Sequence, residues 1–196
     1  EELCFIPFGG SEEFGINLNV YAYKDRLLAV DCGLGFADER FPGIDLLLPD
    51  PQFLEDNMDR LEGLIITHAH EDHIGAVAHL WPRLRCPVFC SPFTAAVLNH
   101  KLKEAGLTRD VNVQILRPGK NGKKLGPFRI QAVNVAHSVP DTRALVIETD
   151  LGRVVHSGDW NLDPRPVLGK PTDAEAFQDA GEAGVLAYIG DSTNSS

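Results

Sequence analysis

Thr67-His68-Ala69-His70-Glu71-Asp72-His73-Ile74-Gly75 is the most informative stretch of this 196-residue chain. It places three imidazoles and two carboxylates within six positions, directly after the apolar run Gly63–Ile66. An apolar run that ends in polar residues is typical of a buried strand that emerges into a loop. If the chain stays extended there, His68 and His70 point to the same side, because side chains alternate along a strand.

The second half of this stretch lies where the chain turns into a helix, which is indicated by apolar side chains at 74, 77, 78 and 80. Asp72 and His73 then face a point beside the first two histidines. Imidazole nitrogens and carboxylate oxygens are common ligands of zinc and related metals. The stretch therefore predicts a site for two metal ions side by side, and the alternative is a histidine-rich loop exposed to solvent.

The composition is that of a folded domain without membrane segments. Hydrophobic residues make up 43% of the chain and charged residues 23%, which is ordinary for globular proteins. No stretch reaches the roughly 18 apolar residues that a membrane span needs, and the N-terminus has no features of a signal peptide. We expect all four cysteines to be reduced and the protein to be cytoplasmic, with no membrane partner.

Charge is distributed unevenly along the chain. The net charge of -10 argues against nucleic-acid binding over the whole surface. Residues 1–80 hold sixteen acidic and four basic side chains, whereas residues 81–130 hold ten basic and two acidic ones. The basic segment either attracts a polyanion or is a solvated helix face and loop. Part of the acidic excess has another explanation, because a site that collects metal cations needs carboxylates.

Further chemical groups follow other expected strands. Apolar runs predict strands at 3–8, 18–23, 27–31, 64–67, 87–90, 111–116, 128–135, 144–149, 153–156 and 185–189, with a polar loop at 117–126. Helices are expected at 51–58, 73–80, 92–105 and 173–183. This order predicts an α/β protein whose mixed sheets carry helices on their outer faces. Ligands often gather at strand ends in such folds, which is where the sequence places Asp31, His137, His156, Asp159 and Asp191.

These residues together resemble a known family. His-x-His-x-Asp-His at 68–73, His137, and Asp159 within Ser-Gly-Asp are similar to the metallo-β-lactamase superfamily of binuclear hydrolases. Other segments narrow the resemblance to the ribonuclease J family, in the β-CASP group of RNA-processing nucleases: Gly9–Asn17, Val30–Gly33, Gly43–Asp45 with Leu48–Asp50, His137–Asp141 and Asp191–Asn194. The family's Gly-Gly-x-Gly-Glu-x-Gly loop has Glu12 here in place of its third glycine, which strains the turn if that position needs a positive φ.

The resemblance implies a metallo-β-lactamase αββα sandwich, of which residues 1–196 are the N-terminal part. The family's chain is far longer. Its β-CASP domain begins about where this sequence ends, and the chain then returns with a further ligand histidine and phosphate-binding groups. We therefore expect an incomplete sandwich with an open sheet edge near 185–189, through which this piece self-associates. The full-length protein is expected to be a homo-oligomer.

The resemblance also implies roles for the site residues. His68, His70 and His137 hold one metal ion, Asp72 and His73 hold the second, and Asp159 bridges the two. Asp72, His73 and Asp159 are therefore expected to take part in catalysis. Two divalent ions are implied, with zinc at the first site and zinc, manganese or magnesium at the second, oxygen-richer site.

Four further residues are expected to support these ligands: Asp31, His156, Ser138 and Asp191. Asp31 is better placed to orient a ligand histidine than to bind metal itself. His156 either does the same or is a core histidine with a satisfied hydrogen bond.

Three functions are compatible with these features. The first is a ribonuclease of RNA processing and decay, acting as a 5′-to-3′ exonuclease, an endonuclease or both, in which a hydroxide activated by two metal ions hydrolyses the phosphodiester. The second is a superfamily hydrolase of a small ester, thioester or lactam, and the third is a non-catalytic domain that binds metal or a partner. The nuclease-like segments favour the first over the second, and the intact ligand set argues against the third.

Overall fold

The computed structural model describes residues 2–190 and Ser192, and the elements of this part of the chain form four layers. The first sheet has six strands in the order β1-β2-β3-β6-β7-β8. Their bounds are Cys4–Gly9, Leu18–Tyr23, Arg26–Val30, Leu61–Ile66, Val88–Cys90 and Val113–Ile115. The first three pair antiparallel, and β3, β6, β7 and β8 run parallel to one another.

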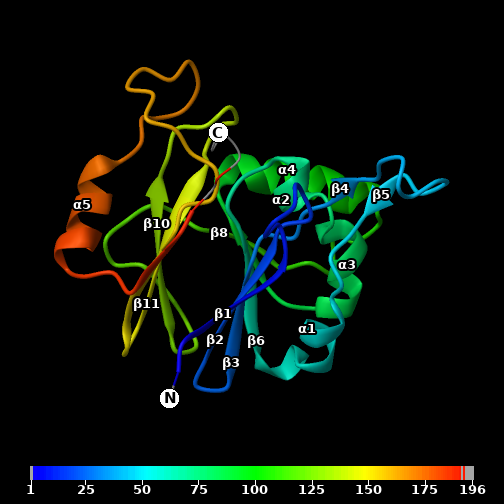
Figure 1. The fold of residues 1–196 in the computed structure, drawn as a ribbon, viewed down its shortest axis with the longest axis horizontal. Coiled ribbons are helices and arrows are strands. Elements are labelled where there is room, and N and C mark those ends of the chain that lie inside the picture. Colours follow the sequence, from blue (N-terminus) through cyan, green and yellow to red (C-terminus); the bar gives the residue numbers. More distant parts are fainter. Residues whose placement is uncertain (1, 191, 193–196) are drawn as a thin grey trace.

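The second sheet has five strands in the order β13-β12-β11-β10-β9. In chain order they are β9 Lys123–Leu125, β10 Phe128–Asn134, β11 Arg143–Thr149, β12 Gly152–His156 and β13 Ala187–Ile189. All neighbours are antiparallel except β12 and β13. A small two-stranded ribbon, β4 Gly35–Phe36 with β5 Leu46–Leu47, extends from the first sheet as the cyan arm in Figure 1.

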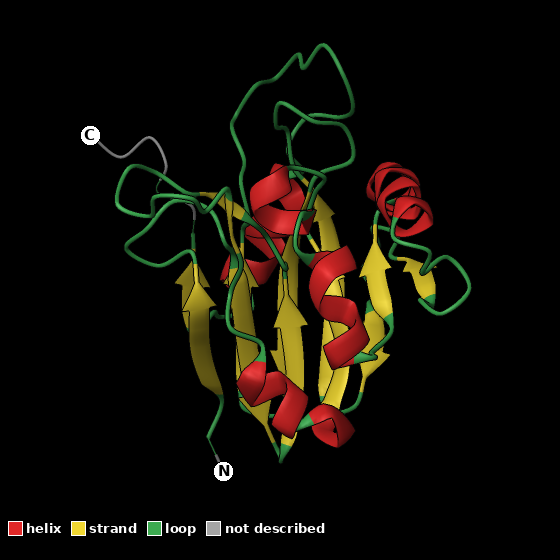
Figure 2. Ribbon diagram, turned by 90° about the vertical axis from the view of Figure 1, so that its right-hand side faces the viewer, coloured by secondary structure: helices red, strands yellow, loops and turns green. Residues whose placement is uncertain are grey.

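Helices cover the outer faces of both sheets. On the six-stranded sheet these are α1 Gln52–Asp56 with the 3₁₀ turn Met58–Arg60, α2 Glu71–Ile74, α3 Val77–Leu84 and α4 Pro92–Glu104. Figure 2 views this sheet from its helical side. A single helix, α5 Ala174–Glu182, packs on the other sheet, and Figure 1 shows the layers in order from α5 to α3. The predicted αββα sandwich is confirmed.

Alternation along the central strands explains why both faces of the first sheet are covered. Leu27 and Ala29 of β3 face the helices, whereas Leu28 and Val30 face the second sheet. Strand β6 alternates in the same way: Leu64 and Ile66 face the helices, and Ile65 faces the second sheet. Side chains at alternate positions of a strand lie on opposite faces, so strands that are apolar throughout become the middle of a sandwich.

Some expected elements differ from those observed. The helix expected at 73–80 is two helices, because the chain bends at Gly75 and Ala76, where the Ala76 amide donates to the carbonyl of Cys32. The loop expected at 117–126 contains β9, a lysine-rich edge strand that has no apolar alternation to reveal it. The strand expected at 185–189 starts at Ala187, and it is the outermost strand of the described sheet.

Glu12 adopts a φ of +60°, so a non-glycine residue occupies the left-handed region in the Gly10–Gly15 loop. Cysteines 4, 32, 86 and 90 are all free, as expected. Within the described residues, no helix is both long and apolar enough to cross a membrane.

Candidate metal centre

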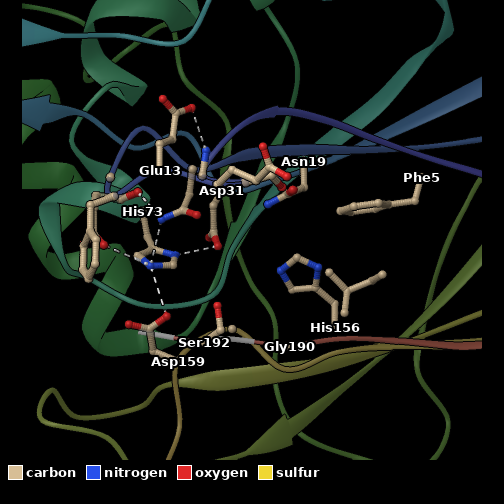
Figure 3. A pocket seen from close by; sticks show the side chains of 18 residues that line it. Phe5, Glu13, Asn19, Asp31, His73, His156, Asp159, Gly190 and Ser192 are labelled. Atoms are coloured by element: carbon tan, nitrogen blue, oxygen red, sulfur yellow. Dashed lines mark hydrogen bonds and ion pairs between the residues drawn. The ribbon is translucent and has the colours of Figure 1, made fainter. Parts of the chain in front are cut away.

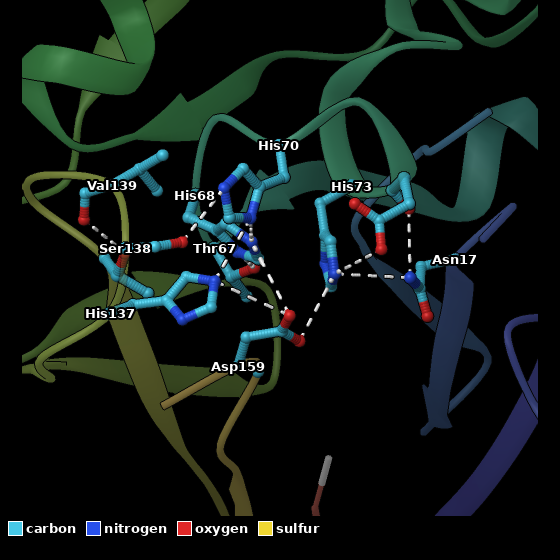
Figure 4. Close-up of polar contacts among 12 residues, drawn as sticks. Asn17, Thr67, His68, His70, His73, His137, Ser138, Val139 and Asp159 are labelled. Atoms are coloured by element: carbon cyan, nitrogen blue, oxygen red, sulfur yellow. Dashed lines mark hydrogen bonds and ion pairs between the residues drawn. The ribbon is translucent and has the colours of Figure 1, made fainter. Parts of the chain in front are cut away.

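Four strands end at the same edge of the sandwich and bring the expected site residues together. His68 and His70 follow β6, His137 follows β10, and Asp159 follows β12. Asp31 follows β3, beside β6 in the same sheet. Because the site is built from both sheets, packing of the sandwich fixes its geometry (Figure 4).

Three imidazole nitrogens converge on one point. Nδ1 of His70 lies 3.0 Å from Nε2 of His68 and 3.1 Å from Nε2 of His137. One nitrogen cannot form two good hydrogen bonds of this kind, since it offers a single proton or a single lone pair. Ligands about 2.0–2.1 Å from a tetrahedral zinc ion stand roughly 3.3 Å apart, which is close to these separations. With Asp159, these histidines place four ligand atoms within 4.8 Å of one another.

The carboxylate of Asp159 faces two groups of ligands at once. Its Oδ2 lies 3.6 Å from Nε2 of His137 and 4.0 Å from Nε2 of His68. Its Oδ1 lies 3.4 Å from Nε2 of His73, which in turn lies 3.5 Å from Oδ2 of Asp72. Asp159 therefore stands between the three-histidine cluster and a second group made of His73 and Asp72.

Asp31 is hydrogen-bonded to His73 and Thr67 in a buried network. Its Oδ2 accepts from Nδ1 of His73 at 2.8 Å, and its carboxylate accepts from both the amide and the hydroxyl of Thr67. Since the Thr67 hydroxyl donates to Asp31, its lone pairs are free to accept from Nδ1 of His68, 3.0 Å away. A proton on Nδ1 leaves the Nε2 lone pair of His68 directed at the cluster.

The electrostatic environment favours a cation between these groups. Burial, with the neighbouring histidines, lowers the pKa of His68, so this imidazole is neutral and able to bind metal at pH 7. Burial alone would also lower the pKa of His73, but the Asp31, Asp159 and Asp72 carboxylates raise it well above its usual value. His73 therefore carries a proton that a metal ion would replace.

The expected supporting residues have different surroundings. Ser138 Oγ lies 3.3 Å from Nε2 of His70, on the ring edge that faces away from the cluster. His156 is buried, and its Nδ1 lies 2.9 Å from the hydroxyl of Tyr21. Among the described residues this contact with Tyr21 is what a core histidine with a satisfied hydrogen bond would show, and a supporting role for His156 stays a prediction. Asp191 lies outside the described residues.

A cavity of about 370 Å³ opens beside His73 (Figure 3). The metal-site residues Asp72, His73 and Asp159 form one wall, the loop Gly10–Gly15 a second, and side chains between the sheets its floor. Five of its lining residues are acidic and, in the described part of the chain, none is lysine or arginine. Among the described residues, the lining of this cavity therefore offers an anionic substrate no positive side chain of lysine or arginine.

Two residues of the site were not assigned a role from the sequence. Asn17 anchors the Gly10–Gly15 loop to α2, because its backbone and side-chain amides both donate to the Asp72 carbonyl, at 3.1 and 3.0 Å. Its Nδ2 also lies 3.2 Å from Nε2 of His73. Thr67 could have been found, since it directly precedes His68 at a strand end. Asn17 ends the segment Gly9–Asn17 that carries the family resemblance, but its spacing gives no sign of a contact with Asp72.

The donor set fits divalent metal ions. At 3.0–3.1 Å the ring nitrogens share at most one proton with Nδ1 of His70, which leaves lone pairs at this point for a cation, and three imidazoles with a carboxylate are a ligand set that zinc prefers. The His/Asp cluster is thus a candidate metal site. Beside it, Asp159, His73 and Asp72 offer one nitrogen and several oxygens, as expected for a harder ion.

Comparisons with known proteins identify the family to which this chain belongs. A family model described as a beta-lactamase superfamily domain matches residues 26–177. A ribonuclease J of Sinorhizobium meliloti is 47% identical over 99% of this chain, which is 35% of that protein. A ribonuclease J of Mycolicibacterium smegmatis is 42% identical over 95% of this chain and 33% of its own length. The chain thus spans about a third of these relatives, and the predicted resemblance to the ribonuclease J family is confirmed.

Solved structures support the fold. The metallo-beta-lactamase fold protein YhfI from Bacillus subtilis superposes with a TM-score of 0.54 and 19% identity, covering 78% of this chain and 58% of that one. At this identity the likeness concerns the fold alone.

Proposed function

The chain belongs to the β-lactamase superfamily, and from this premise we propose that it forms the metal-binding part of a ribonuclease that hydrolyses RNA phosphodiester bonds. The observation that carries the proposal is the position of Asp159, whose two carboxylate oxygens face two separate ligand groups. Similarity to proteins named ribonuclease J supports RNA as the substrate. We further propose that two divalent ions bind, one at His68, His70 and His137 and one at Asp72 and His73.

Each residue of the site has a distinct task in this proposal. His68, His70 and His137 would hold one divalent ion and Asp72 and His73 the other, and such ions, when bound, would supply an activated water and offset negative charge on the phosphate. Asp159 keeps the two ligand groups in register, since one rigid carboxylate contacts both. Asp31 holds His73 in place through Nδ1, which leaves Nε2 directed at the second group. Ser138 positions His70 in the same way from the opposite ring nitrogen.

The cavity's charge is consistent with hydrolysis of a phosphodiester. Glu12, Glu13, Asp31, Asp72 and Asp159 line it, so a phosphate is repelled until metal ions are bound. This arrangement makes substrate binding itself depend on metal.

The test uses the full-length gene product, loaded with zinc or manganese, and a single-stranded RNA labelled at one end. We expect cleavage that stops on chelation and resumes on metal addition, with products that carry a 5′-phosphate. Asp72→Ala and His70→Ala should each lower the rate by at least about 100-fold, because both remove a ligand. The matched control is His100→Ala, a change at an exposed histidine on α4 that contacts Glu104 rather than the site.

Products that end in a 2′,3′-cyclic phosphate would contradict the proposal, because they arise from attack by the RNA's own 2′-hydroxyl. Full activity of Asp72→Ala would also contradict it. Hydrolysis of a thioester or lactam, with no action on RNA, would favour the small-molecule alternative.

A further inference from the structure

The loop Gly10–Gly15 presents a large aromatic side chain at the metal centre without burying it. Phe14 lines the same cavity as Asp72, His73 and Asp159, and it is 79% exposed. An exposed phenylalanine loses the favourable free energy that its burial would give. Its position beside a candidate catalytic site leaves the ring free to contact a bound ligand.

The loop that carries Phe14 is held at both ends. The backbone amide of Gly10 donates to Glu13 Oε1 at 3.3 Å, and Gly15 packs so closely on Gly35 that a Cβ there would lie 3.2 Å from its Cα. After the loop, Asn17 is bonded to the carbonyl of Asp72. The Phe14 backbone is thus tied to the same helix that presents Asp72 and His73. A loop held in this way has little backbone freedom left to lose when a ligand stacks on the Phe14 ring.

Local charge indicates which part of an RNA approaches this wall. Glu12 and Glu13 flank Phe14 on the N-terminal side and line the cavity. A phosphate next to these carboxylates is repelled, whereas an uncharged nucleobase is not. Aromatic rings bind single-stranded RNA by stacking on bases, and this contact tolerates any sequence because every base has a π-face.

We propose that Phe14 is the stacking platform for a nucleobase next to the scissile phosphate, and so positions RNA over the metal centre. This inference rests on the proposed function and names a residue that binds the substrate. The phosphate is held by metal ions on one wall of the cavity while the adjacent base stacks on Phe14 at the other. Phe14 is a positioning residue, because it takes no part in the chemistry.

The test measures KM and kcat of the full-length protein on a short single-stranded RNA. Phe14→Ala should raise KM by about 5- to 100-fold, the range found when a base-stacking aromatic is removed, with kcat little changed. Phe14→Trp should restore KM to within a few-fold of wild type, whereas Phe14→Leu should not, because leucine replaces apolar area but not the ring face. Phe36→Ala is the matched control, since Phe36 is 73% exposed but does not line the cavity.

A second arm uses RNAs with one abasic nucleotide at successive positions around the cleavage site. At the nucleotide that stacks on Phe14, removal of the base should raise the KM of the wild-type protein and leave the KM of Phe14→Ala unchanged. The inference is overturned if Phe14→Leu equals wild type, which would indicate packing against another part of the protein, or if Phe14→Ala has an unchanged KM. A wild-type protein that binds metal but cleaves no RNA would instead refute the proposed function, so the two failures are distinguishable.

Discussion

A methyl group added at residue 33 would press on the half of the metal centre that holds Asp72 and His73. A Cβ built on Gly33 lies 1.6 Å from the carbonyl oxygen of Asp72 and 2.8 Å from the backbone nitrogen of His73. Both are backbone atoms, so no side-chain rotation relieves the clash. To reach an ordinary contact, the start of α2 must move by roughly 2 Å relative to β3.

Gly33→Ala should therefore separate the two ligand groups without unfolding the domain. A displacement of about 1 Å at a catalytic centre can cost 100-fold in rate, so we expect RNA cleavage to fall by at least about that factor. Overpacking of this kind typically destabilises a protein by about 1–3 kcal/mol. Metal analysis should find the ion of the three-histidine cluster retained and the second ion lost, with an unchanged far-UV circular dichroism spectrum.

Gly181→Ala is the control for this experiment. Gly181 lies in α5, where an added Cβ meets no atom within 4 Å, and alanine favours a helix. This variant should retain both ions and full activity. If Gly33→Ala also keeps two ions and the wild-type rate, then the close contact between Gly33, in the loop after β3, and α2 does not position Asp72 and His73, and this reasoning is refuted.

The hydrogen bonds of Asp31, the burial of His156 and the open sheet edge at β13 each have a measurable consequence. Asp31→Asn should weaken the affinity for the second ion by about 10- to 100-fold in calorimetric titration, because His73 loses its charged partner; unchanged affinity would exclude an orienting role for Asp31. Burial lowers the pKa of His156 from 6.5 to about 4, so the unfolded chain binds a proton that the folded one does not as pH falls below 6.5. Between pH 6.5 and pH 4 the free energy of unfolding of the metal-free wild type should fall by roughly 3 kcal/mol more than that of His156→Asn. Urea denaturation at both pH values measures this difference, and an equal loss in the two proteins would contradict the prediction. Residues 1–196 expressed alone should hydrolyse RNA poorly and self-associate through the edge strand β13. Leu186, just before this strand, and Tyr188, within it, are 60% and 52% exposed. A monomer at high concentration in analytical ultracentrifugation would count against this prediction.

Much of the fold was predictable from sequence because the sandwich depends on local patterns. Strand segments that are apolar throughout, such as Leu64–Ile66 at the end of β6, have to lie between two covering layers, and hairpins have to be antiparallel. Strands whose sequences lack an apolar pattern were not predicted. The ribbon β4–β5 has two residues in each strand, and β9 begins with two lysines, so pairing with neighbours rather than composition defines them.

The site residues were predictable to a different degree. His68, His70, Asp72 and His73 form a dense local motif, and strand ends directed attention to Asp159. The two-sided position of Asp159 depends on the packing of one sheet on the other, which no local pattern encodes. Asn17 was missed because its partner Asp72 is 55 residues away in the chain. The contact of His156 with Tyr21 needed the structure, because Tyr21 lies in the opposite sheet.

The central claim is a pair of metal ions that share Asp159. Anomalous diffraction from crystals of the zinc-loaded full-length protein, measured on both sides of the zinc absorption edge, tests it most directly. We predict two peaks about 3.5–4 Å apart, one among His68, His70 and His137 and one against His73 and Asp72, with the Asp159 carboxylate between them. A single peak at full zinc occupancy, or a second peak away from Asp159, would contradict the claim.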